Sequence, residues 1–205
     1  MKDNNLENIN FLWYSFLNGD DKVFAAIYQQ YIERLLSYGY KLTSDRDLVH
    51  DCIQEIFLNL FLKRKNGGKK IENLKAYLFV ALRYGIAKRI KKQKKHEPLE
   101  LNEDFENQLF ESEYNVQNQL IKFELSTELK DKLSDAVSNL PPKQKEIIYL
   151  KFEEELNYSE ISEVMKISVE SSRKLLYRSL LSLRRIIDPK AIEVLFAIFF
   201  KKTSK

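Results

Sequence analysis

Asp51 and Glu55 stand one helical turn apart, a spacing at which two carboxylates can exchange protons with a substrate. One helical pair is weak evidence for catalysis, because acid–base chemistry also needs reactive groups held nearby. His50 and His96 have no nucleophile or set of metal ligands at a matching spacing. The "NGG" at 66–68 lacks the strand–loop–helix setting of a phosphate-binding loop. We therefore expect that the protein is not an enzyme and that it binds no metal, cofactor or small-molecule substrate.

Positive charge gives a stronger chemical signal. The stretch 81–95, "ALRYGIAKRIKKQKK", carries seven Lys or Arg and no acid, whereas the whole chain is only +4. A solvated helix face normally mixes both signs, although a plain solubilising surface is the alternative interpretation. A block of one sign favours an anionic partner, of which a nucleic-acid backbone is the commonest. The nearby Tyr77 and Tyr84 could stack on unpaired bases, whereas Phe79 fits a core position better.

The elements that must position these residues are helices. Gly (5) and Pro (4) are scarce and the chain is 44% apolar, which favours an all-α protein with a buried core. Apolar residues at helical spacing predict four helices in the first half, at 6–19, 22–40, 47–64 and 73–94. They should form a bundle of three or four helices. The single cysteine, Cys52, lies in the third and is expected to be a buried small hydrophobe.

Capping residues mark the ends of these helices. Gly19 should end the first helix, and Asp20 or Asp21 should begin the second. Ser44 or Asp45 should begin the third.

A second set of signals begins near residue 140. Pro141 and Pro142 suit a first helical turn, and Asn157 with Glu160 fits a capping box that begins a short helix. The turn at 166–168 separates that helix from a longer basic one, whose inner face has four apolar side chains at spacings of four, three and four: Leu176, Leu180, Leu183 and Ile187. Two helices around a tight turn predict a helix-turn-helix motif. Its outer face offers cations and an aromatic ring to a DNA major groove, namely Arg173, Lys174, Tyr177 and Arg178.

Charge divides the chain into two small helical domains joined by an acidic linker. Residues 97–135 hold eleven Asp or Glu against three Lys, so we expect the domains at 8–96 and 136–187. A tail at 188–205 should be helical. Its apolar run, 191–200, is shorter than the ~20 residues that span a bilayer. The first residues have no apolar signal region, which predicts a cytoplasmic protein.

Taken together, the motifs of both halves resemble those of the extracytoplasmic-function sigma factors of the sigma-70 superfamily. "DLVHDCIQEIFLNLF" is similar to the family's D-x-x-Q-E-x-F segment, "AYLFVALRYGIAKRIKKQKK" to its promoter-melting helix, and "YSEISEVMKISVESSRKLLYRSLLSLR" to its second DNA-binding domain. The resemblance implies two helical domains that bind core RNA polymerase and the promoter −10 and −35 elements. It places the polymerase contacts on four residues: Asp51, Gln54, Glu55 and Phe57.

The resemblance also assigns the promoter contacts. For the −10 element they fall on Arg83, Tyr84, Lys88, Arg89, Lys91 and Lys92, and for the −35 element on Ser171, Arg173, Lys174, Tyr177 and Arg178. Two positions depart from the family. Tyr84 stands where the family usually has Asn, beside the pocket for a flipped base, and Ser172 stands where an apolar residue normally packs. The resemblance further implies an anti-sigma factor, often membrane-anchored, that covers both domains.

Two alternatives remain open at this point. A free-standing helix-turn-helix regulator would bind duplex DNA without polymerase, and changing Asp51, Gln54 or Glu55 would have no effect on it. An adaptor protein that does not bind DNA would tolerate charge reversal across 88–95.

Overall fold

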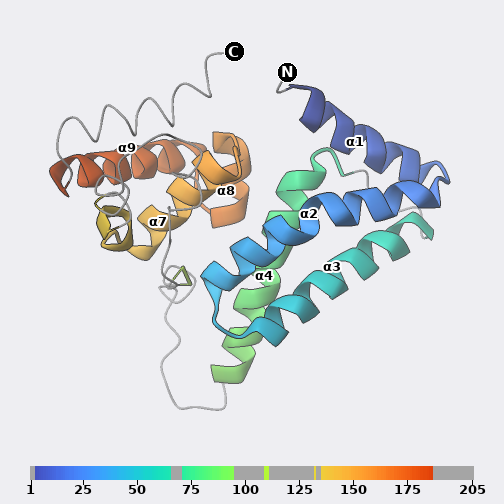
Figure 1. Cartoon of the computed structure of the whole chain (residues 1–205), viewed down its shortest axis with the longest axis horizontal. Coiled ribbons are helices and arrows are strands. Elements are labelled where there is room, and N and C mark those ends of the chain that lie inside the picture. The colour runs from blue at the N-terminus through green and yellow to red at the C-terminus, as the bar shows by residue number, and fades with distance from the viewer. Residues whose placement is uncertain (1–2, 66–70, 95–108, 111–131, 133–134, 187–205) are drawn as a thin grey trace. The chain divides into compact units, whose positions relative to one another are not determined.

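A computed structural model describes residues 3–65, 71–94, 109–110, 132 and 135–186. The chain divides into two compact units, Met1–Leu109 (unit 1) and Phe110–Lys205 (unit 2). Every regular element among the described residues is helical (Figure 1), which confirms the expected all-α class. The predicted tail at 188–205 and nearly all of the predicted linker lie outside the described residues.

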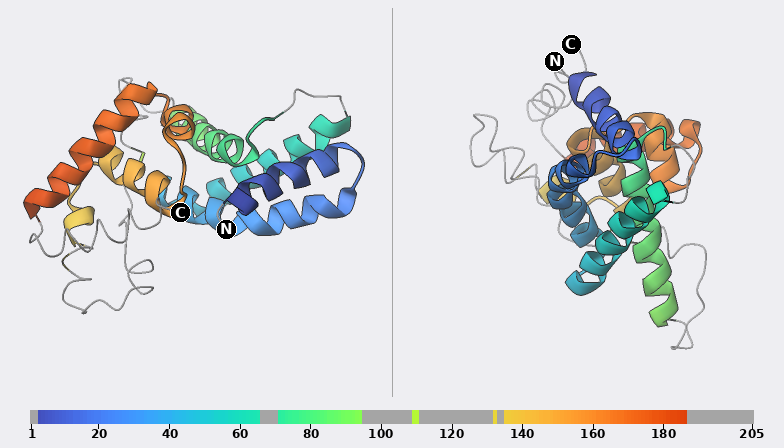
Figure 2. Two further views of the ribbon diagram at one scale, coloured as in Figure 1. Left: turned by 90° about the horizontal axis from the view of Figure 1, so that it is seen from above. Right: turned by 90° about the vertical axis from the view of Figure 1, so that its right-hand side faces the viewer.

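The described part of unit 1 forms a bundle of four helices: α1 (Asp3–Leu17), α2 (Asp21–Leu42), α3 (Arg46–Lys65) and α4 (Leu74–Lys94). Helix α2 packs against the other three, and α3 also packs along α4 (Figure 1, Figure 2). The core between them is rich in large rings and leucines, including Trp13, Tyr38, Phe79 and Leu82, each of them fully or almost fully buried. Phe79 is therefore a core residue, as its position in the apolar pattern predicts.

The predicted helix ends in unit 1 are also confirmed. Gly19 follows α1 with φ 118°, a left-handed conformation that suits glycine. The Asp20 side chain accepts a hydrogen bond from the Lys22 backbone N–H at 3.1 Å, and the Asp45 side chain accepts one from that of Leu48 at 3.0 Å. Helix α4 begins in the same way, because Asn73 accepts from the Ala76 N–H at 3.0 Å. These caps satisfy backbone donors that have no partner within their helices.

A layer of aromatic rings joins α2 to α3. Phe24 lies 5.5 Å from Phe61 and 6.0 Å from Phe57 between ring centroids, and Tyr28 lies 4.8 Å from Phe57. Phe57 is only 4% exposed as a result. Its side chain contributes to the bundle core, so it presents no surface to a partner, contrary to the expectation from the resemblance.

Unit 2 contains α7 (Pro142–Ile148), a π-helical turn η2 (Tyr149–Glu153), α8 (Tyr158–Met165) and α9 (Val169–Ile186). Helix α9 packs against both α7 and α8 (Figure 2). The capping box predicted at Asn157 and Glu160 is present, with bonds of 3.0 and 2.6 Å in the two directions. Lys166 ends α8 in the left-handed region, and Ser168 caps α9 by accepting from the Ser171 N–H at 3.0 Å. The predicted helix-turn-helix motif is confirmed.

The π-helical turn η2 was not apparent in the sequence. It widens the end of α7, where the Glu154 N–H donates to the Tyr149 carbonyl five residues earlier. The buried Glu154 carboxylate also accepts a 3.0 Å hydrogen bond from the Tyr149 hydroxyl. Phe110, which falls in the predicted linker, is buried with its ring centroid 6.0 Å from that of Tyr149.

Candidate protein and nucleic-acid interface

The outward side of α3 carries an acidic and amide surface. Asp51, Gln54 and Glu55 are exposed, and we call these three side chains the docking face. The intervening Cys52 and Ile53 point inward and are at most 2% exposed. Because the helix turns once every 3.6 residues, the spacing three and four places the docking face on one stripe. The inner side of the same helix is packed into the core of unit 1, which holds the stripe in place.

Leu58 extends the docking face by one further turn. It is 57% exposed, although it is a large apolar residue on a helix whose other apolar residues mostly face inward. The sequence interpretation missed it because a leucine is usually assigned to the core. The available signal was its spacing of four and three from Gln54 and Glu55. The surface therefore combines charge, an amide and an apolar contact.

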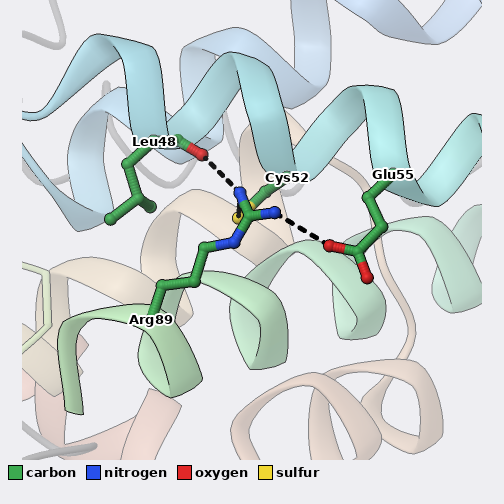
Figure 3. Close-up of polar contacts among 4 residues, drawn as sticks. All are labelled: Leu48, Cys52, Glu55 and Arg89. Atoms are coloured by element: carbon green, nitrogen blue, oxygen red, sulfur yellow. Dashed lines mark hydrogen bonds and ion pairs between the residues drawn. The ribbon is translucent and has the colours of Figure 1, made fainter. Parts of the chain in front are cut away.

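Arg89 reaches from α4 to this surface (Figure 3). One terminal nitrogen of its guanidinium donates to the Leu48 carbonyl at 3.3 Å and to the Cys52 Sγ at 3.2 Å. The other donates to Glu55 Oε2 at 2.8 Å, an ion pair in which the Glu55 side chain stays 60% exposed. Burial raises the pKa of the Cys52 thiol, and the Arg89 guanidinium partly offsets that effect. The thiol is buried, as the sequence predicted.

The other predicted −10 residues on α4 separate into two groups. Tyr84 is 52% exposed, and Lys88, Lys91 and Lys92 are also on the surface. Arg83 is only 3% exposed and lies on the packed side of α4, so its side chain is not part of this surface. The cationic face of α4 thus consists of Tyr84, Lys88, Lys91 and Lys92. One aromatic ring beside three exposed cations is suited to a phosphate backbone with an unstacked base.

Tyr77, one candidate for base stacking, is already engaged inside unit 1. The Lys63 Nζ donates to its hydroxyl at 3.0 Å and lies 4.4 Å from its ring centroid. This contact joins the last turns of α3 to the first turn of α4.

In unit 2 the outward side of α9 carries the predicted −35 residues. Tyr177 is 64% exposed, and the other four members of this set are exposed as well: Ser171, Arg173, Lys174 and Arg178. The opposite side of α9 is packed, with Leu176 4% and Leu183 1% exposed. Helix α9 therefore has a polar, cationic outer surface, and its apolar side is packed into unit 2.

Contacts inside unit 2 orient two of these cations. The Arg173 guanidinium lies 5.5 Å from the ring centroid of Tyr158, and the Lys151 Nζ lies 4.9 Å from the same centroid. Lys151 also donates to the Leu156 carbonyl at 3.2 Å. Burial lowers the pKa of the Lys151 ammonium, and the Glu160 carboxylate opposes this shift. Lys174 pairs with Glu170 one turn earlier on α9. These contacts of Tyr158 could not be predicted from the sequence, because its cation partners lie on other elements.

Ser172, the departure from the family pattern in α9, is fully buried. Its hydroxyl donates to the Val169 carbonyl at 2.7 Å and lies 3.4 Å from the Tyr158 carbonyl oxygen. A buried hydroxyl that is hydrogen-bonded avoids most of the cost of desolvation. The serine thus fits its site between α8 and α9.

Two features are absent from the described residues. Within these ranges, three or more His, Cys, Asp or Glu side chains nowhere gather closely enough to hold a metal ion. Likewise, none of the helices described combines the length and apolar character needed to cross a bilayer.

Comparison with known proteins matches both units. Residues 27–96 match the family Sigma-70 region 2, and residues 130–183 match Sigma-70, region 4. The ECF RNA polymerase sigma factor SigM of Bacillus subtilis (strain 168) is 28% identical over 153 residues, which are 75% of this chain and 88% of that protein. The fold is similar to that of the sigma factor RpoE from Bartonella quintana, solved in complex with the anti-sigma factor NepR. That match has a TM-score of 0.54 and 18% identity, and it covers 80% of this chain and 96% of RpoE.

These matches cover both the α3–α4 bundle and the helix-turn-helix, in the order that the sequence predicted. The chain therefore belongs to the sigma-70 superfamily of promoter-recognising initiation factors, and it is similar to an extracytoplasmic-function member of that superfamily.

Proposed function

We propose that this sigma factor binds core RNA polymerase through the docking face of α3 and melted −10 promoter DNA through the cationic face of α4. The observation that carries the proposal is the pair of chemically different outward faces on one packed bundle, acidic on α3 and cationic on α4. An acidic and amide stripe with a neighbouring exposed leucine suits a protein partner. The cationic face suits phosphates.

The α9 surface would read the −35 element as duplex DNA. Arg173 and Arg178 are five residues apart on α9, about 1.4 helical turns, and both are exposed. Arginine pairs well with guanine edges in the major groove. Lys174 and Ser171 would contact the backbone, which sets the register of the helix on DNA. The domains would extend over 8–96 and 136–187, with 97–135 as the linker.

On the α4 side, Tyr84 would stack against a base of the melted strand. Exposing a base costs a few kcal/mol of lost stacking and pairing, which a fitted aromatic contact must offset. Lys88, Lys91 and Lys92 would hold the adjacent phosphates. The basic loop at 66–70, predicted to assist base capture, lies outside the described residues. Polymerase carries out the chemistry, so the sigma factor itself would contribute binding in the cytoplasm and no catalysis.

Transcription reconstituted from core polymerase and promoter fragments tests this proposal. We expect promoter-specific transcripts with the wild-type protein, loss of core binding in Asp51→Lys/Gln54→Ala, and retained core binding with weakened promoter use in Arg173→Ala/Arg178→Ala. Charge reversal at the exposed Glu33 on α2 is the matched control and should leave both activities intact. Binding of promoter DNA by the wild-type protein alone, with no association with core polymerase, would instead favour a free-standing regulator.

An anti-sigma factor is the expected regulator, since the similar RpoE was solved with one. Such a partner would cover the docking face or the cationic surfaces, and it would compete with core polymerase. When this sigma factor is isolated from its own cells, we expect a co-purifying protein whose addition before core polymerase suppresses promoter-specific transcription.

A further inference from the structure

The Arg89 side chain is held by α3 at three points that span two helical turns (Figure 3). The Leu48 carbonyl and the Cys52 sulfur share one terminal nitrogen, and Glu55 takes the other. Leu48 and Cys52 are buried, with exposures of 6% and 2%, so a partner molecule does not reach these two contacts. They hold the plane of the guanidinium from within the bundle.

With that plane fixed, the other terminal nitrogen points at Glu55. A guanidinium is a rigid planar fork, so two anchored contacts determine where its third donor lies. The Glu55 carboxylate accepts through Oε2 alone, and its side chain remains 60% exposed. Its other oxygen is thus available at the surface of the docking face. These bonds engage three of the five guanidinium N–H groups and hold the side chain along α3, so Arg89 is less able than the exposed lysines of α4 to reach a DNA phosphate.

We propose that Arg89 is a positioning residue for polymerase docking and not a phosphate contact. It holds the Glu55 carboxylate in one orientation on the docking face and ties α3 to the DNA-binding helix α4. This inference rests on the proposed function, in which Glu55 contacts polymerase. Fixing a flexible glutamate before the encounter lowers the entropic cost of binding.

The Arg89→Lys variant distinguishes positioning of Glu55 from contact with a DNA phosphate. Lysine keeps the positive charge but cannot reproduce the planar set of guanidinium donors. We expect the purified full-length variant to bind core polymerase about 3- to 10-fold more weakly, the range expected when one long side chain must be immobilised. The dependence of holoenzyme–promoter affinity on salt should not change. Lys88→Gln, on the same helix, is the matched control, and it should change promoter binding but not core binding. Its core affinity should stay as in the wild type, and its salt slope should fall by about 0.7–0.9.

Glu55→Ala completes a double-mutant cycle. If Arg89 acts through Glu55, Arg89→Lys should weaken core binding little further in the Glu55→Ala background. Equal unfolding midpoints for the wild type and Arg89→Lys would show that lost stability is not the cause.

Three outcomes for the Arg89 variants would overturn the inference. The first is wild-type core affinity in Arg89→Lys. The second is a salt slope in Arg89→Gln that falls as in Lys88→Gln. The third is an additive loss in the Glu55→Ala background. If the wild-type protein does not bind core polymerase at all, the proposed function fails instead. If it does bind and Glu55→Ala has no effect, the role of Glu55 fails, and that of Arg89 fails with it.

Discussion

Tyr158 lies outside the proposed −35 surface but contacts one of its members. Its ring faces the guanidinium of Arg173 on α9 and the ammonium of Lys151 on η2. An arginine over an aromatic face loses fewer conformations when it binds a base edge, because it is already partly ordered. In the proposed reading of the −35 element, Tyr158 therefore supports Arg173.

We expect Tyr158→Leu to weaken use of a promoter with a −35 element by roughly 2- to 5-fold, since an exposed cation–π contact contributes about 0.5–1 kcal/mol. Tyr158→Phe keeps the ring and should behave as the wild type. The measurement is the holoenzyme–promoter dissociation constant. An unchanged constant in Tyr158→Leu, or an undiminished loss when Arg173→Ala is also present, would contradict this role.

At the scale of elements, the closeness of α2 and α3 depends on a glycine. A Cβ at Gly39 would overlap the Val49 side chain, which is buried between the two helices. The sequence contains another helical glycine, Gly85 on α4, whose added Cβ would meet the Cys52 Sγ at 3.5 Å, an ordinary contact distance. Both glycines lie inside long helices, but only Gly39 lies where the packing of two helices leaves no space for a Cβ.

This difference predicts opposite effects of alanine on stability. Gly39→Ala should lower the free energy of unfolding by about 1–3 kcal/mol, the usual cost of overpacking a tight core. Gly85→Ala should leave it unchanged or raise it by about 0.5–1 kcal/mol, because alanine favours the helix. Urea unfolding followed by helical circular dichroism measures both changes. A Gly39→Ala variant as stable as Gly85→Ala would show that α2 and α3 can move apart at little cost.

At the scale of the whole molecule, two separately folded units are joined by one chain. When one unit holds its promoter element, the tether raises the effective concentration of the other unit near its own element. Each surface should therefore contribute only on promoters that carry its element.

We expect Arg173→Ala/Arg178→Ala to weaken the binding of holoenzyme to a complete promoter and to have no effect on a promoter whose −35 element is scrambled. Lys88→Gln/Lys91→Gln/Lys92→Gln should weaken binding to both promoters and reduce the salt slope by roughly 2–3, because each lost phosphate contact removes about 0.7–0.9. Titrations of both promoters at several salt concentrations test this. If the α9 variant has the same effect on both promoters, α9 does not read the −35 element.

The sequence alone determined the features that depend on near neighbours. The capping box at Asn157 and Glu160 and the cap at Asp45 join residues three positions apart, so their chemistry is visible in a short window. The helical repeat of apolar residues likewise identified the buried side of α9 and left its cations outside. The order of these signals along the chain was sufficient to identify the family.

Only the tertiary structure decided which residues of the candidate surfaces are available. The bonds of Arg89 to Glu55 and Leu48 join residues 34 and 41 positions apart, and they depend on how α4 packs along α3. Phe57 and Arg83 looked like surface residues by their motif positions, but packing of the bundle buried both. The physical reason is that caps and helical faces follow from interactions within a few residues. The partner of a long side chain, in contrast, depends on the register between helices, which the whole core sets.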